Sequence, residues 1–165
     1  MTVAHFLSEL RQKSDLKAKT LEGYAIAFRG IVAGIFGIDG GREKIDHRSG
    51  GHARWLEQIH AVRLSEVTPE RVQAWKRSFL ARAGKDPIAL RSARTSFNSF
   101  LRRAKSLFAP GAIKHLELQL PSPLPFEGIA FEPRQSMRYR SSIDAEELTG
   151  KLLEFKRGQE SGRSS

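Results

Sequence analysis

Residues 87 to 108 constrain the fold of this 165-residue chain more than any other stretch, because both ends of a long helix are marked there. Asp86 can accept hydrogen bonds from the first free backbone N–H groups, and Pro87 suits the first helical position. Pro110 and Gly111 stop a helix soon after Phe108. The stretch between these signals predicts a helix of about six turns.

This helix carries two stripes of side chains. At about 100° per residue, apolar side chains recur on one narrow face, which indicates burial. A polar, basic stripe lies about 80° round the helix, and no carboxylate lies between residues 87 and 108. We interpret the basic stripe as facing a polyanion, and a merely solvated basic face is the alternative. The apolar stripe is Leu90, Ala93, Phe97, Leu101, Ala104 and Phe108, and the basic stripe is Arg91, Arg94, Asn98, Arg102 and Lys105.

The residues before this helix predict further helices, so the fold class is all-α. Apolar side chains at helical spacing indicate a short helix after Thr2, a second one reaching Gly37, and a third around Trp55. Thr68, followed by proline and glutamate, marks the start of a fourth helix. We expect residues 1–110 to form a small orthogonal bundle of four to five helices.

The chain changes character after residue 110. Leucines alternate with polar residues from Leu116 to Leu120, and the prolines that follow exclude a helix. We therefore expect residues 111–140 to be an extended linker or strand. Residues 141–157 predict one further helix, with Leu148, Leu152 and Phe155 on one face, and residues 158–165 a disordered tail.

The charge balance favours an anionic partner. The net charge is +10, and residues 1–108 contain 20 lysines and arginines against 10 acidic residues, whereas residues 109–165 contain 8 against 8. Such a field favours nucleic acid or an anionic surface. The chain has no cysteine, which excludes disulfide and thiolate chemistry. Residues 24–38 are the most apolar run, but they are too few for a membrane span and include Arg29.

Four stretches resemble the N-terminal core-binding domain of the tyrosine recombinase, or phage integrase, family. Thr20 and Tyr24, followed by Phe28 and Arg29, are similar to one helix of that domain. Residues 67–70 resemble the turn into its next long helix, and residues 92–108 resemble its last helix. Residues 139–148 resemble the entry into the first helix of the family's catalytic domain.

The resemblance implies a helical bundle that forms half of a clamp around duplex DNA. It also implies a separate catalytic domain, which breaks and rejoins DNA with a tyrosine nucleophile, arginines, a lysine and histidines. None of these catalytic residues can be assigned here. His60 and Arg63 have the family's His-x-x-Arg spacing, but no tyrosine follows at the expected distance, and Leu152 stands where Thr149-Gly150 would need an arginine. We therefore expect no catalytic residue, no metal and no cofactor on this chain.

The expected function is double-stranded DNA binding as the core-binding module of a site-specific recombinase. We expect one set of side chains to contact phosphates and a second set, on the basic stripe, to meet base edges. Thr20 and Arg29 join these sets through the resemblance, and the alternative for Arg29, which lies near the apolar run, is a structural pairing with a carboxylate. The first set is Lys17, Lys19, Arg71, Arg77, Arg103 and Lys105, and the second is Arg91, Arg94, Asn98 and Arg102.

Two other functions remain open. The chain could be a fragment of a complete DNA strand-breaking and rejoining enzyme, or a stand-alone architectural or regulatory DNA-binding protein. The expected partners are duplex DNA and further recombinase protomers on it, with neither a membrane nor a small-molecule substrate. The expected location is the cytoplasm, in association with the nucleoid if the source is bacterial.

Overall fold

The computed structural model describes residues 1–133, and in this range the protein is all-α, as the sequence predicted. Two short 3₁₀ segments, η1 (Gly41–Ile45) and η2 (Leu64–Glu66), connect neighbouring helices. The expected helix at 141–157 and the expected tail at 158–165 lie outside the described residues. The helices are α1 (Val3–Lys13), α2 (Ala18–Phe36), α3 (Gly51–His60), α4 (Pro69–Ala81), α5 (Pro87–Ser106) and α6 (Pro110–Ile113).

The helix boundaries follow the local signals in the sequence. Thr2 and Thr68 accept hydrogen bonds from backbone N–H groups at the starts of α1 and α4. Asp86 Oδ1 accepts from the Ile88 N–H at 3.3 Å at the start of α5. Gly37, with φ of 63°, ends α2 in the left-handed conformation that glycine adopts without strain. The long helix ends at Ser106, two residues earlier than its apolar stripe suggested.

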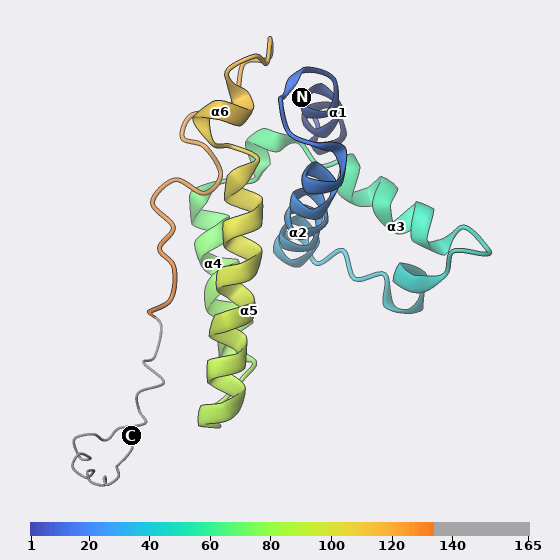
Figure 1. Ribbon diagram of the computed structural model, residues 1–165. Helices are drawn as coiled ribbons and strands as arrows, with labels where there is room; N and C mark the ends of the chain where they lie inside the picture. The colour runs from blue at the N-terminus through green and yellow to red at the C-terminus, as the bar shows by residue number, and fades with distance from the viewer. Residues whose placement is uncertain (134–165) are drawn as a thin grey trace, which may run out of the picture. The chain divides into compact units, whose positions relative to one another are not determined.

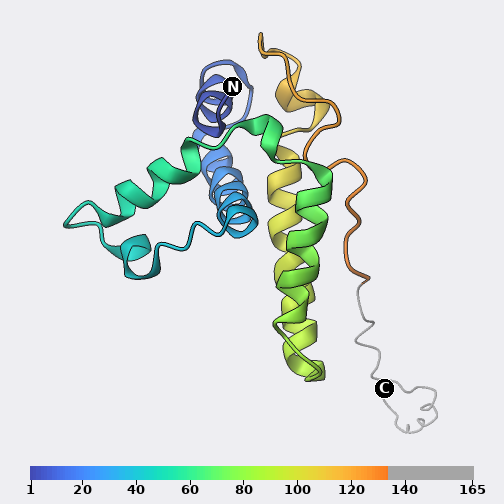
Figure 2. The same cartoon turned by 180° about the vertical axis from the view of Figure 1, so that it is seen from behind.

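Helix α2 is the centre of the bundle. It packs against α1 and α3 and also against α4 and α5 (Figure 1). Helices α4 and α5 run side by side in opposite directions, and both views show this pair as a hairpin (Figures 1 and 2). Two backbone hydrogen bonds, Val3 N–H to Val62 O at 2.8 Å and Leu64 N–H to Met1 O at 3.0 Å, fix the N-terminus to the connection between α3 and α4.

Four phenylalanines join segments that are far apart in the sequence. Phe6 of α1 stacks on Phe108, with ring centroids 4.7 Å apart. Phe28 of α2 meets Phe6, Phe108 and Phe126 edge to face, and Phe108 and Phe126 are 5.8 Å apart. All four side chains are buried. We call Phe6, Phe28, Phe108 and Phe126 the phenylalanine cluster.

The compact unit extends beyond the boundary that we expected at residue 110. It ends at Glu132, because Ala112, Phe126 and Ile129 are buried in the same core as the helices. Residues 114–133 contain neither a regular helix nor a strand, and this segment runs alongside the α4–α5 pair (Figures 1 and 2). Its prolines keep it irregular, while its apolar side chains anchor it to the bundle.

Two glycines of α2 differ in how closely other groups approach them. A Cβ atom at Gly34 would lie 2.4 Å from Nε1 of Trp75, whereas one at Gly30 would lie at an ordinary contact distance, 3.9 Å, from Phe100. The close approach at Gly34 is therefore made by an indole ring of α4. No helix within residues 1–133 has the length and apolar character needed to cross a membrane.

Alanine substitutions at the two glycines should have opposite effects. Gly30→Ala should stabilise the protein by up to about 1 kcal/mol, because alanine favours the helix and has room there. Gly34→Ala should destabilise it by about 1 to 3 kcal/mol, because the new methyl group overlaps Trp75. Urea denaturation of both variants measures the difference, and equal effects would contradict the close packing of Trp75.

A second pair of substitutions tests whether the C-terminal segment belongs to the core. Phe126→Ala should lower the free energy of unfolding by about 3 to 5 kcal/mol, because it leaves a cavity beside the rings of Phe28 and Phe108. Phe131→Ala removes the same number of atoms from a side chain that is 45% exposed, and should change stability by no more than about 0.5 kcal/mol. Thermal and urea unfolding of the two variants provide the comparison.

Candidate nucleic-acid interface

The positive charge of the chain is concentrated on α4, α5 and their connection, which we call the α4–α5 hairpin. Residues 69–106 contain ten lysines and arginines against two acidic residues, Glu70 and Asp86, whereas residues 1–68 contain ten against eight. Asp86 also caps α5. Eight of the ten net positive charges of the chain therefore belong to the hairpin.

Seven basic side chains of the hairpin are exposed and form no ion pair within residues 1–133, and we call them the outer cations. Two of them lie over aromatic rings, Arg82 at 5.8 Å from the centroid of Phe79 and Lys105 at 5.4 Å from that of Phe131. These contacts leave their charge without a neutralising partner. The outer cations are Arg77, Arg82, Lys85, Arg91, Arg102, Arg103 and Lys105.

The exposed side of α5 combines cations with small hydroxylated residues. Arg91 and Arg102 are eleven residues apart, which places them within about 20° of one another around the helix and about 16 Å apart along it. Ser92 and Thr95 are exposed between them. Arginine, serine and threonine are side chains that commonly bind phosphate oxygens, and the short hydroxyl side chains allow a backbone to approach closely.

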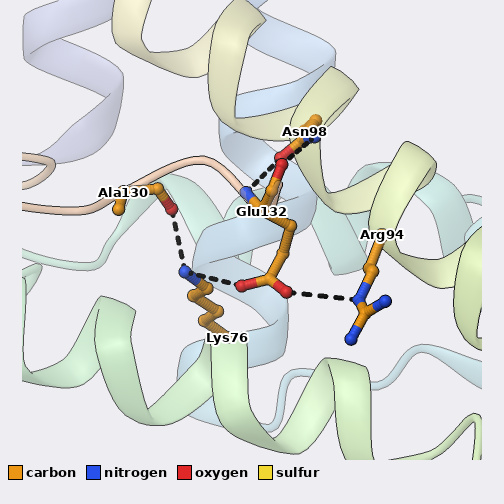
Figure 3. A network of polar contacts seen from close by, with 5 residues as sticks. All are labelled: Lys76, Arg94, Asn98, Ala130 and Glu132. Carbon is orange, nitrogen blue, oxygen red and sulfur yellow. Dashed lines mark hydrogen bonds and ion pairs between the residues drawn. The ribbon is translucent and has the colours of Figure 1, made fainter. Parts of the chain in front are cut away.

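The remaining basic stripe is in contact with the end of the described chain. Residues 130–132, which we call the strap, lie against α4 and α5 (Figure 3). Asn98 Nδ2–H donates to Glu132 O at 3.0 Å, and the Glu132 N–H donates to Asn98 Oδ1 at 2.8 Å. The amide of Asn98 is thus paired with the backbone N–H and C=O groups of one residue, Glu132, through two hydrogen bonds.

The carboxylate of Glu132 lies between two cations. Lys76 Nζ is 3.1 Å from Glu132 Oε2 and donates to Ala130 O at 2.8 Å, and Arg94 Nε is 3.4 Å from Glu132 Oε1 (Figure 3). Lys76 is only 8% exposed. Its ammonium group also lies 5.0 Å from the centroid of Phe97, over the ring.

These contacts change the expectation for two residues. Arg94 and Asn98 were expected to meet base edges, but the strap occupies both side chains in this structure. Sequence reasoning missed Lys76 and Glu132. Lys76 follows Val72 by four residues, so it borders the buried stripe of α4. A lysine is unusual at such a position, and this was the one indication in the sequence that Lys76 has a special role. No pattern in the sequence pointed to Glu132.

Arg29 has a structural role, which is the alternative to DNA binding that its place near the apolar run left open. It is 7% exposed, its Nε–H donates to His60 Nε2 at 3.1 Å, and its Nη1–H donates to Glu22 Oε2 at 3.0 Å. The bond to Glu22 lies within α2, whereas the bond to His60 connects α2 to the last residue of α3. His60, which matched the spacing of a catalytic histidine, is the acceptor in this contact.

The other expected contact residues differ in their availability. Lys17, Lys19 and Thr20 are exposed at the start of α2. Arg71 Nη1 is 2.8 Å from Glu66 Oε1, and its guanidinium carbon lies 5.4 Å from the centroid of Phe36. Within residues 1–133, no three histidine, aspartate or glutamate side chains are grouped so that they could hold a metal ion.

Comparison with known protein families, with curated proteins and with solved structures finds no match to this chain.

The contact between Arg29 and His60 should make stability depend on pH. Burial, followed by the charges of Arg29 and Arg11, lowers the pKa of His60 below its ordinary value. The folded protein therefore favours the neutral ring of His60. The contribution of this ring to the free energy of unfolding is complete above about pH 6.5, and it decreases as the pH falls from there towards the pKa of His60 in the folded protein. Thermal melting between pH 7.5 and pH 5 should show a smaller loss for His60→Gln, whose amide oxygen can accept from Arg29, than for the parent. Parallel losses in both proteins would contradict this assignment.

Proposed function

We propose that this protein binds double-stranded DNA through the α4–α5 hairpin. The observation that carries the proposal is the group of outer cations, which lie on one helical hairpin and have no carboxylate partners in the part of the chain that the structure describes. Like charges so close together destabilise a fold by mutual repulsion. A polyanion removes this repulsion when it binds, and a duplex offers phosphates at regular spacing.

Helix α5 is the main binding element in this proposal. We revise the role of Arg91 and Arg102, which we expected from the sequence to meet base edges. Their separation of about 16 Å exceeds the major-groove width of about 12 Å, so they can contact phosphates on either side of a groove. The hydroxyl groups of Ser92 and Thr95 donate further hydrogen bonds to phosphate oxygens. These contacts orient the duplex without reading its sequence.

We further propose that the protein acts as the core-binding module of a site-specific recombinase of the tyrosine recombinase type. Residues 20–29, 67–70 and 92–108 resemble that domain, which supports this proposal. The resemblance of residues 67–70 also implies that a long helix starts there, and α4 does start at Pro69. In this role the chain holds DNA in the cytoplasm, beside further protomers, and performs no cleavage itself.

Fluorescence anisotropy with a labelled 30-base-pair duplex of mixed sequence tests the proposal. If the outer cations contact about five phosphates, the logarithm of the association constant should fall with the logarithm of the salt concentration with a slope of about −4 to −5. An affinity that does not change with salt would refute binding through the phosphates.

Arginine substitutions on α5 test which surface makes these contacts. Arg91→Ala and Arg102→Ala should each weaken binding and reduce the salt slope by about 0.9, because each removes one phosphate contact. Arg48→Ala is the matched control, since it removes the same charge from an exposed position outside the hairpin. A loss of affinity as large for the control as for the α5 variants would show that net charge alone, without a defined surface, causes binding.

A further inference from the structure

We propose that Lys76 and Arg94 form a second phosphate-binding site on the hairpin, with Asn98 beside it as a base-reading side chain, and that the strap occupies all three side chains until DNA displaces it. The inference rests on the proposed function. It adds a site that includes Lys76 and a competition between Glu132 and a phosphodiester for the same cations.

The site has the composition of an anion-binding site. Two cations from neighbouring helices face one carboxylate, with Lys76 Nζ at 3.1 Å and Arg94 Nε at 3.4 Å from its two oxygens. A phosphodiester also presents two charged oxygens to cations at such distances, so the carboxylate of Glu132 stands where a phosphate would bind. Lys76 is nearly buried, which means that an anion bound there is shielded from solvent and from salt.

The strap satisfies this site incompletely. The Nε–H of Arg94 is buried and has no hydrogen-bond partner, although Glu132 Oε1 lies 3.4 Å away. A buried donor without an acceptor lowers stability, because water has been removed from it and nothing replaces the lost hydrogen bond. A phosphodiester is not tied to the backbone of the strap, so it can place one of its two anionic oxygens at hydrogen-bonding distance from this N–H.

Asn98 is also bonded to the strap in a way that DNA can reproduce. It donates one hydrogen bond to the Glu132 carbonyl at 3.0 Å and accepts one from the Glu132 N–H at 2.8 Å. The edge of adenine in the major groove offers the same combination of one donor and one acceptor to an asparagine amide. Displacement of the strap therefore exposes a side chain that can read a base.

The strap can leave without opening the core. Its anchor is Ile129, which is buried, whereas Ala130 and Phe131 are exposed. The contacts that hold residues 130–132 are those to Lys76, Arg94, Asn98 and Lys105. All four side chains belong to the hairpin that we propose as the DNA-binding surface. In the closed state, while the strap is bound, Lys76 and Arg94 cannot bind a phosphate. The strap therefore lowers the apparent affinity for DNA, because only the fraction of molecules with a displaced strap can bind DNA at this site.

Amide exchange in the unmodified protein tests the displacement directly. The Glu132 N–H donates to Asn98, so its hydrogen exchange, followed by NMR, should become faster when a 30-base-pair duplex saturates the protein. The Leu101 N–H, in the buried part of α5, is the internal control and should stay protected. Unchanged or increased protection of Glu132 in the complex would overturn the inference.

A matched pair of substitutions tests the competition. Glu132→Gln keeps the shape of the side chain and removes its charge, and it should tighten duplex binding by about tenfold, because the closed state loses its charge-assisted bonds. Glu117→Gln makes the same change of net charge at a side chain that is 82% exposed, and should have a much smaller effect. Equal affinities of the two variants, or weaker binding by Glu132→Gln, would overturn the competition.

The outcomes separate this inference from the proposed function. If the parent binds duplex DNA with the expected salt dependence while the two glutamine variants bind equally well, the outer cations remain the binding surface and only the strap inference fails. If the parent and both variants fail to bind, the proposed function fails and the inference fails with it. Tighter binding by Glu132→Gln alone supports both.

Discussion

The structure depends on the phenylalanine cluster, because it is where four separate parts of the chain meet. Phe6, Phe28, Phe108 and Phe126 come from α1, from α2, from just beyond α5, and from the irregular C-terminal segment. Burial of large aromatic side chains is the strongest apolar contribution that such a small bundle has available. Because Phe126 is part of it, the cluster also determines where the chain runs after the last helix. The strap reaches the hairpin for this reason.

The phenylalanine cluster and the outer cations lie in different parts of the molecule. The apolar contacts lie among α1, α2 and the inner sides of α4 and α5, and the unpaired charge lies on the outer side of the hairpin. Lys76 is the exception, since it is a cation at the border of the core. Its burial is tolerated because the carbonyl of Ala130, the carboxylate of Glu132 and the ring of Phe97 replace the water that it has lost.

The sequence predicted those features that depend on neighbouring residues. Helix starts at Thr2, Thr68 and Asp86 followed from capping side chains, and the buried stripe of α5 followed from its spacing. It did not predict features that depend on distant pairs. Asn98 and Glu132 are 34 residues apart, and Arg29 and His60 are 31 apart. Periodicity contains no information about such pairs, so His60 was not identified as the partner of Arg29, and Phe126 was assigned to a linker or strand. The choice of DNA as the partner is still a prediction.

The way Asn98 holds Glu132 separates two properties of the strap. Both hydrogen bonds go to the main chain of residue 132, which is the same for every residue type except proline, whereas the ion pairs with Lys76 and Arg94 need a carboxylate. The register of the strap is therefore independent of the side chain at position 132. A substitution at position 132 can therefore change how strongly the strap is held by Lys76 and Arg94 while the path of the backbone stays the same. An acidic residue there is held strongly and a neutral residue weakly. If the strap competes with DNA as we propose, evolution can therefore adjust the threshold for its displacement in small steps without redesign of the fold.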